Sequence, residues 1–275
     1  GVYATPASAD KITLEKAQSL LSCGTGQADS QIIQTTDGKP LIKDGRLYLC
    51  LTTRGFEQIP DSYQGVYSLD ISSFELRLEG ALFFGKGDGI IYGFHATKVV
   101  YDAENEEFLV ITTSHGDTHT LVYASTKANL LHGIHYLECK ELDFPHNYTR
   151  GNEIETKYNT EDPDFFYDEK TNKWLMAICR LDPATRKYRY VFFESDSAFE
   201  GYKFIGAGYD GAETGGSFVK VDGELYFVCG NDFNKRANYR IYHKGGMTEA
   251  KFDYDDGGFR GWGTLMPVKM GSRTR

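Results

Sequence analysis

The sequence has few cysteines and no long apolar run, and each shortage excludes a class of protein. Its five cysteines are scattered over 275 residues without a Cys-x-x-Cys pair, so neither a zinc ribbon nor a thioredoxin-type centre is indicated. No run is long and apolar enough to cross a membrane as a helix. Basic residues number 30 against 39 acidic ones, and the net charge of −9 argues against binding to nucleic acid or an anionic membrane surface.

Aromatic residues are abundant instead, at 14% of the chain, with 19 tyrosines and 18 phenylalanines. Such side chains favour β-sheets and also stack on sugar rings. The balance of 40% hydrophobic and 25% charged residues is typical of a globular protein, and the length allows a sizeable core. Cys50, Cys179 and Cys229 lie inside apolar strand-like runs, which predicts buried free thiols.

Only one segment has a helical pattern. Asp10 can cap residues 11–21, in which one face carries Leu14, Ala17, Leu20 and Leu21. The remainder consists of short runs rich in β-branched and aromatic residues, separated by Asp-Gly, Glu-Asn and Thr-Asn turn signals. This pattern predicts an all-β protein.

One hairpin pattern recurs along the chain, at intervals of about 50 to 70 residues. Each copy has an apolar strand, a turn with Asp or Asn, and a second strand carrying an aromatic residue. The copies begin near Lys39, His95, Asp162, Glu213 and Trp262. Two packed β-domains are the alternative, but they would not explain the regular return of one hairpin. The repeat therefore predicts a five-bladed β-propeller with a short N-terminal helix.

The whole chain, residues 1–275, is expected to form this single propeller domain, with residues 1–30 holding the helix and a blade-closing segment. In a propeller the innermost strand of each blade begins at the central channel, so residues that open the repeats should meet in one funnel. Asp162 and Glu213 are then two carboxylates from adjacent blades. Glycoside hydrolysis requires such a pair, one protonated and one ionised.

Two segments, EDPDFFYDEKTNKWLMAICR and ETGGSFVKVDGELYFVCG, resemble the five-bladed propeller glycosidases of glycoside hydrolase families 43 and 32. The resemblance implies that Asp162 tunes the acid or stabilises the transition state and that Glu213 is the general acid. Those families carry an Asp directly before a Pro in the first blade, where this chain has Lys39. Asp37, two residues earlier, is the candidate base. The alternatives are that the base lies elsewhere or that the hydrolytic step is lost.

Other residues near the predicted funnel are candidates for binding substrate. His95 could bind a sugar hydroxyl or transfer a proton, because its ordinary pKa lies near neutral pH. Arg54 and Arg260 lie in Gly-flanked turns and could clamp an anionic group on a sugar. Trp262 is a candidate stacking platform, and Lys39 lies at the start of the first repeat.

No residue pattern predicts a metal site. His115 and His119 are four residues apart, but on a strand end this spacing favours a surface loop over zinc. A structural Ca²⁺ lies in the channel of some members of the families that this chain resembles, and such an ion would leave little trace in the sequence. No cofactor is expected.

The predicted function is hydrolysis of a glycosidic bond in an oligosaccharide or polysaccharide. The chain begins without methionine, as a trimmed mature form would, and a secreted or periplasmic location is expected. Two rivals remain. A non-catalytic propeller would hold sugar in the same funnel, and a polysaccharide lyase would use His95 to abstract a proton beside a uronate carboxylate.

Overall fold

The computed structural model describes the greater part of the chain. The described residues are 26–54, 62–114, 119–145, 160–181, 185, 187–209, 211–231, 238–251, 264–270 and 273–274. Within them every regular element is a strand, which confirms the all-β prediction. The helix expected over residues 10–21 lies outside the described residues. In the part of the chain described, no helix is long and apolar enough to cross a membrane.

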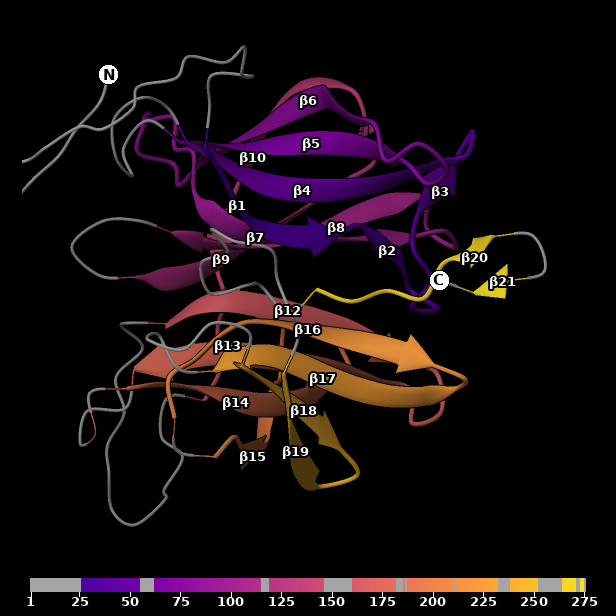
Figure 1. Cartoon of the computed structure of the whole chain (residues 1–275). Helices are drawn as coiled ribbons and strands as arrows, with labels where there is room; N and C mark the ends of the chain where they lie inside the picture. Colours follow the sequence, from indigo (N-terminus) through magenta and orange to yellow (C-terminus); the bar gives the residue numbers. More distant parts are fainter. Residues whose placement is uncertain are drawn as a thin grey trace, which may run out of the picture.

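The strands form four large sheets, here called blades 1 to 4 (Figure 1). Blade 1 contains β1 (Gly26–Ile32), β4 (Arg46–Arg54), β5 (Tyr63–Asp70), β6 (Leu76–Gly85) and β10 (Gly133–Glu138), in that order, with β3 (Ile42–Lys43) beside β4. Blade 2 contains β11 (Lys140–Glu141), β9 (Thr120–Thr126), β8 (Glu107–Ser114), β7 (His95–Asp102) and β2 (Gln34–Thr35). The chain of blade 1 thus supplies β2 to blade 2, and β10 returns to blade 1. This exchange ties the two blades together.

Blades 3 and 4 are simpler four-stranded meanders. Blade 3 runs β12 (Thr160–Asp168), β13 (Lys173–Leu181), β14 (Tyr188–Ser195) and β15 (Lys203–Ala207). Blade 4 runs β16 (Glu213–Val221), β17 (Glu224–Asn231), β18 (Asn238–His243) and β19 (Gly246–Lys251). Figure 1 shows blades 1 and 2 in the upper half of the view and blades 3 and 4 in the lower half.

The prediction of five blades is wrong, because the described residues build four. Beyond Lys251 they supply only the two-stranded hairpin of β20 (Lys269–Met270) and β21 (Arg273–Thr274). Trp262, taken as the start of a fifth repeat, lies outside the described residues. Dividing the chain length by the repeat interval overestimated the number of blades, since it counted the segments before β1 and after β19 as a further blade.

Each innermost strand, β1, β7, β12 and β16, carries a β-bulge close to its start. At each bulge one residue has a positive φ: Asp29 (55°), Ala96 (51°), Asp162 (51°) and Gly215 (56°). Positive φ is uncommon for residues other than glycine, and bulges cluster near functional sites, where they redirect a side chain. The four residues therefore occupy equivalent positions at one end of the channel.

Side chains from the preceding blade hold three of these bulges in place. Thr52 Oγ1 accepts a hydrogen bond from the backbone N–H of Ala96 (3.0 Å), and Thr113 Oγ1 accepts one from Asp162 (3.1 Å). The backbone N–H of Gly216 donates to the Tyr190 hydroxyl (2.5 Å). Each bulge is thus fixed by its neighbouring blade as well as by its own sheet.

Hydrophobic clusters lie between successive blades, one between blades 1 and 2, a second between 2 and 3 and a third between 3 and 4. Cys50, Cys179 and Cys229 are buried and free, as predicted. Blade 4 also contacts blades 1 and 2 directly, since Gln31 Nε2 on β1 donates to Gly216 O and Gln34 Nε2 on β2 donates to Phe218 O, both at 3.4 Å. The Gln31 contact links the first and last blades.

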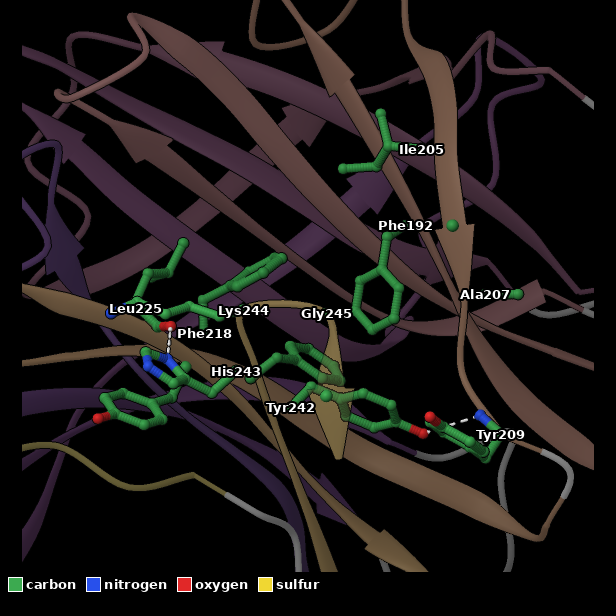
Figure 2. A pocket seen from close by; sticks show the side chains of 14 residues that line it. Phe192, Ile205, Ala207, Tyr209, Phe218, Leu225, Tyr242, His243, Lys244 and Gly245 are labelled. Atoms are coloured by element: carbon green, nitrogen blue, oxygen red, sulfur yellow. Dashed lines mark hydrogen bonds between the residues drawn. The ribbon is translucent and has the colours of Figure 1, made fainter. Parts of the chain in front are cut away.

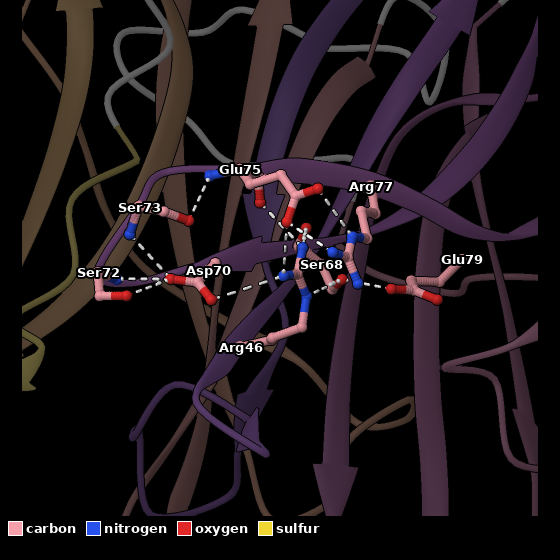
Figure 3. Close-up of polar contacts among 8 residues, drawn as sticks. All are labelled: Arg46, Ser68, Asp70, Ser72, Ser73, Glu75, Arg77 and Glu79. Carbon is pink, nitrogen blue, oxygen red and sulfur yellow. Dashed lines mark hydrogen bonds and ion pairs between the residues drawn. The ribbon is translucent and has the colours of Figure 1, made fainter.

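At the far end of blade 1 from the bulges, Arg46 organises the β5–β6 turn (Figure 3). Its guanidinium donates to Ser68 Oγ (2.7 Å), Ser68 O (2.9 Å) and Glu75 O (2.9 Å). Asp70 accepts hydrogen bonds from the hydroxyl and backbone N–H of Ser72, and these bonds hold the pKa of Asp70 well below its usual range. This network is structural, because it lies at the opposite end of β4 from Arg54 and the channel bulges.

Candidate functional site

Three carboxyl groups gather at the bulge end of the inner strands. Asp29 and Asp162 occupy equivalent positions in blades 1 and 3, and each is only 6% exposed. Glu161 precedes Asp162 on β12, and its side chain is 23% exposed. The three groups are close enough that the charge of Glu161 raises the pKa values of Asp29 and Asp162, and the charge of Asp29 raises that of Asp162. They form the candidate site.

Burial raises the pKa of Asp162 well above its usual range, and the charges of Glu161 and Asp29 raise it further. Burial also raises the pKa of Asp29, with Glu161 adding to the effect, although a hydrogen bond from Thr52 and the charge of Arg54 oppose it. Like charges so close together cannot all ionise in a low-dielectric site. The cluster therefore retains a proton at pH values where isolated carboxyls have lost theirs.

Asp162 is held from three blades. Its Oδ2 accepts a hydrogen bond from Thr214 Oγ1 (2.8 Å) and one from the backbone N–H of Gly215 (3.3 Å), both in blade 4. The Tyr190 hydroxyl donates to Asp162 O (3.2 Å), and Thr113 of blade 2 accepts a hydrogen bond from the backbone N–H of Asp162. Such contacts fix both the strained backbone and the orientation of the carboxyl group.

Glu161 is the most accessible of the three carboxyls. Its Oε2 lies 3.4 Å from Nδ1 of His119, the residue just before β9 of blade 2. A carboxyl oxygen of Glu161, one of Asp162 and Sγ of Cys179 lie within 4.8 Å of one another. Burial raises the pKa of the Cys179 thiol, so this sulfur stays protonated. Because Ca²⁺ takes oxygen ligands, two carboxyls and a neutral thiol fit that ion poorly.

Glu213, the predicted general acid, opens β16 as expected, but its carboxylate is fully buried between blades 3 and 4. It accepts hydrogen bonds from Arg240 Nη1 (2.8 Å), from the backbone N–H of Tyr190 (2.7 Å) and from the Tyr242 hydroxyl. The next residue, Thr214, is the one whose side chain reaches Asp162. Adjacent residues of a strand face opposite sides, so the structure does not bring the Glu213 and Asp162 carboxyls together. The catalytic role of Glu213 stays a prediction.

Asp37 and Lys39 pair with each other at the opposite end of the inner strands. They follow β2, which pairs with Val100 and Tyr101 at the end of β7 remote from His95. The structure therefore separates Asp37, the predicted base, from the three carboxyls. Asp29 was missed by the sequence analysis, although it occupies the first-blade position equivalent to Asp162.

Two of the predicted binding residues do lie at the end of the channel that holds the three carboxyls. Arg54 ends β4, and its charge lowers the pKa of Asp29, which places the guanidinium near that carboxylate. His95 is buried at the start of β7, with Nε2 2.6 Å from the Ser62 hydroxyl. Arg260, Trp262 and His115 lie outside the described residues.

No protein-family model and no curated protein matches this chain. Several solved structures match its fold. One is Zg3597, a family 117 glycoside hydrolase of the marine bacterium Zobellia galactanivorans, with a TM-score of 0.56 and 9% identity over 88% of this chain and 70% of that one. A thermostable family-43 glycoside hydrolase has a TM-score of 0.51 and 15% identity, covering 86% of this chain and 74% of its own.

A fructofuranosidase from Schwanniomyces occidentalis, complexed with fructose, also has a TM-score of 0.56, with 12% identity. The match covers 85% of this chain and 47% of that enzyme. At these identities the likeness concerns the fold. The chain shares the propeller architecture of glycoside hydrolases, with four blades in its described residues.

An Asp162→Asn variant is expected to be more stable than the unaltered protein at pH 7. An Asp with a raised folded-state pKa stabilises the fold below its unfolded pKa and loses that contribution as the pH rises through the folded pKa. Asn does not ionise, so the variant does not lose this stability as the pH rises. Asn also tolerates a positive φ and can still accept the hydrogen bonds from Thr214 and Gly215. Thermal unfolding should show a gain of a few degrees at pH 7 that disappears near pH 3. A gain that is equal at both pH values would contradict the raised pKa.

Proposed function

We propose that this protein is a glycoside hydrolase whose catalytic carboxyls are Glu161 and Asp29, assisted by Asp162. The observation that carries the proposal is the convergence of three carboxyls, two of them with raised pKa values, at one end of the channel. Glycoside hydrolysis needs one carboxyl that keeps its proton and another that is ionised. The fold shared with glycoside hydrolases supports the same reaction class.

In this mechanism Asp162 keeps the proton, because its pKa is raised, and Glu161 relays it to the glycosidic oxygen. Glu161 takes this part because it is the more exposed of the two. The bond between that oxygen and the anomeric carbon then breaks. Asp29, on a different blade, acts in its ionised form, which the hydrogen bond from Thr52 and the charge of Arg54 favour. It accepts a proton from the water that attacks the anomeric carbon. The products are an alcohol and a free reducing sugar. Arg54, near Asp29, would bind a hydroxyl or an anionic group of the sugar.

The substrate is proposed to be an oligosaccharide or polysaccharide, which suits a secreted or periplasmic protein. Matching structures include a fructofuranosidase and an exo-β-1,3-galactanase from Phanerochaete chrysosporium, so fructans and β-1,3-galactans are the first substrates to test. The lyase alternative would require His95 to reach the substrate, and its Nε2 is bonded to Ser62.

The test is a screen of aryl glycosides, inulin and β-1,3-galactan with the unaltered protein and an Asp29→Asn variant. Products are followed by their reducing ends and by ultraviolet absorbance. Reducing sugar released by the unaltered protein alone supports hydrolysis through Asp29. An absorbing, unsaturated product that disappears in His95→Ala would establish a lyase. Binding without any cleavage would make the protein a carbohydrate-binding propeller.

A further inference from the structure

A groove of about 470 Å³ lies between blades 3 and 4 (Figure 2), and none of the three carboxyls lines it. Its walls come from β14 and β15 on one side and from the β17–β19 strands on the other. Side chains that line it include those of Phe192, Ile205, Tyr209, Leu225 and Tyr242. The volume is within the range of small-molecule sites, which is roughly 300–1,000 Å³.

The groove is open because residues along its edges have small side chains or none. Gly206 and Ala207 lie on one edge, and Gly245 and Gly246 lie on the other. A Cβ added at Gly206 would meet no atom within 4 Å, so nothing fills the space beside this strand. Larger side chains here would bury the aromatic residues behind them.

Aromatic faces form the interior of the groove. The Tyr209 and Tyr242 rings stack with centroids 6.3 Å apart and planes 28° apart, and Phe192 meets Tyr242 edge-on at 5.6 Å. Tyr209 is 51% exposed, as is Ile205 elsewhere along the groove. An aromatic ring with one face open to solvent presents the surface on which the C–H groups of a sugar ring stack.

Polar groups border these rings without adding net charge. Lys244 lines the groove, and its Nζ lies 2.8 Å from Glu224 Oε2, so its charge is compensated. The Tyr209 backbone N–H donates to the Tyr242 hydroxyl (3.0 Å), which in turn donates to the buried Glu213. Aromatic faces beside hydroxyl and amine groups, with balanced charge, suit an uncharged sugar better than an ionic ligand.

We propose that this groove is a second carbohydrate-binding site, in which a neutral oligosaccharide stacks on Tyr209 and Tyr242. The choice of a sugar rests in part on the proposed function, but the site does not use the catalytic carboxyls. It would hold a polysaccharide chain against the side of the protein while the channel acts on a chain end or a neighbouring strand.

The test measures binding by calorimetry and affinity electrophoresis with three probes: inulin, β-1,3-galactan oligosaccharides and xyloglucan. Asp29→Asn is the starting protein, so that a cleavable probe is not consumed. Adding Tyr209→Ala should weaken binding about tenfold, since about 1.4 kcal/mol of stacking corresponds to that factor. Tyr209→Phe should bind like the starting protein, because it keeps the ring. Tyr136→Ala is the matched control, since Tyr136 is 50% exposed on β10 of blade 1.

The proposal is overturned if the starting protein binds none of the three probes, or if Tyr209→Ala binds as tightly as Tyr136→Ala. It is also overturned if Tyr209→Ala instead abolishes self-association in sedimentation, which would make the groove a contact between two copies of this chain. Failure of the hydrolysis screen together with loss of binding in Tyr209→Ala would remove the proposed enzyme activity and leave the binding site standing.

Discussion

Asp29→Asn is expected to lower kcat by about 10²–10⁴-fold on any glycoside that the protein cleaves, the range that one acid–base group contributes. The amide cannot accept a proton from water. The change should leave the fold intact, because Asn tolerates the positive φ at this bulge and can keep a hydrogen bond with Thr52. Steady-state kinetics should show the loss in kcat with little change in KM.

Asp37→Asn is the matched comparison, because it makes the same chemical change at the opposite end of the inner strands. The comparison decides between the two candidates for the base. Loss of activity in Asp29→Asn alone supports the proposed mechanism. Equal activity of Asp29→Asn and the unaltered enzyme would contradict this mechanism. Loss of activity in Asp37→Asn alone would identify Asp37 as the base, as first predicted from the sequence.

Glu161→Gln and Glu213→Gln separate the two candidates for the acid. If Glu161 gives up the proton, its Gln variant should recover on aryl glycosides whose leaving group needs no protonation. Glu213→Gln should chiefly lower thermal stability, because it weakens a buried ion pair with Arg240. Selective recovery in Glu213→Gln would instead show that this carboxyl leaves Arg240 to act on substrate.

The sequence allowed prediction of the hairpins and of three of the four inner-strand starts. His95 and Glu213 open β7 and β16, and Asp162 lies near the start of β12. These starts were accessible because apolar runs, Asp-Gly turns and aromatic residues are local signals. The first inner strand was missed, since its sequence GQADSQI is short of apolar residues and the proline after Lys39 marked a different start.

The sequence pattern could not predict the direction in which each side chain of the candidate site points. A bulge inserts a residue and changes which side chain faces the channel. Nothing in the sequence around Asp29 or Glu213 indicates that β1 and β16 contain bulges. On β16, Thr214 donates a hydrogen bond to Asp162, while the carboxylate of the preceding Glu213 accepts one from Arg240. The partner of Glu213, Arg240, lies 27 residues away on β18, where only the three-dimensional fold brings them together.

Lys98→Met is expected to cost about 3–5 kcal/mol of stability, the usual effect of leaving one member of a buried ion pair alone. Lys98 Nζ lies 2.8 Å from Asp164 Oδ1, and both side chains are fully buried between β7 and β12. The other carboxylate oxygen of Asp164 accepts the backbone N–H of Phe218 at 2.5 Å. This pair therefore joins blades 2, 3 and 4 just below the candidate site.

The loss should depend on pH with a definite sign. Burial already raises the pKa of Asp164, and Lys98 opposes that rise. Without the lysine the folded-state pKa rises further, so Lys98→Met should be least stable relative to the unaltered protein at neutral pH and should recover as the pH falls toward the unfolded pKa. Urea unfolding at pH 7 and pH 4 measures both values.

The double variant Lys98→Met/Asp164→Leu distinguishes an unpaired charge from poor packing. If the cost of Lys98→Met comes from the stranded carboxylate, removing that carboxylate should restore most of the stability, because apolar replacements of buried ion pairs are often neutral or stabilising. The Phe218 N–H would still lack its acceptor, which leaves a residual loss of about 1–3 kcal/mol. If the double variant is instead as unstable as the sum of the two single variants, the pair contributes through shape and not through charge.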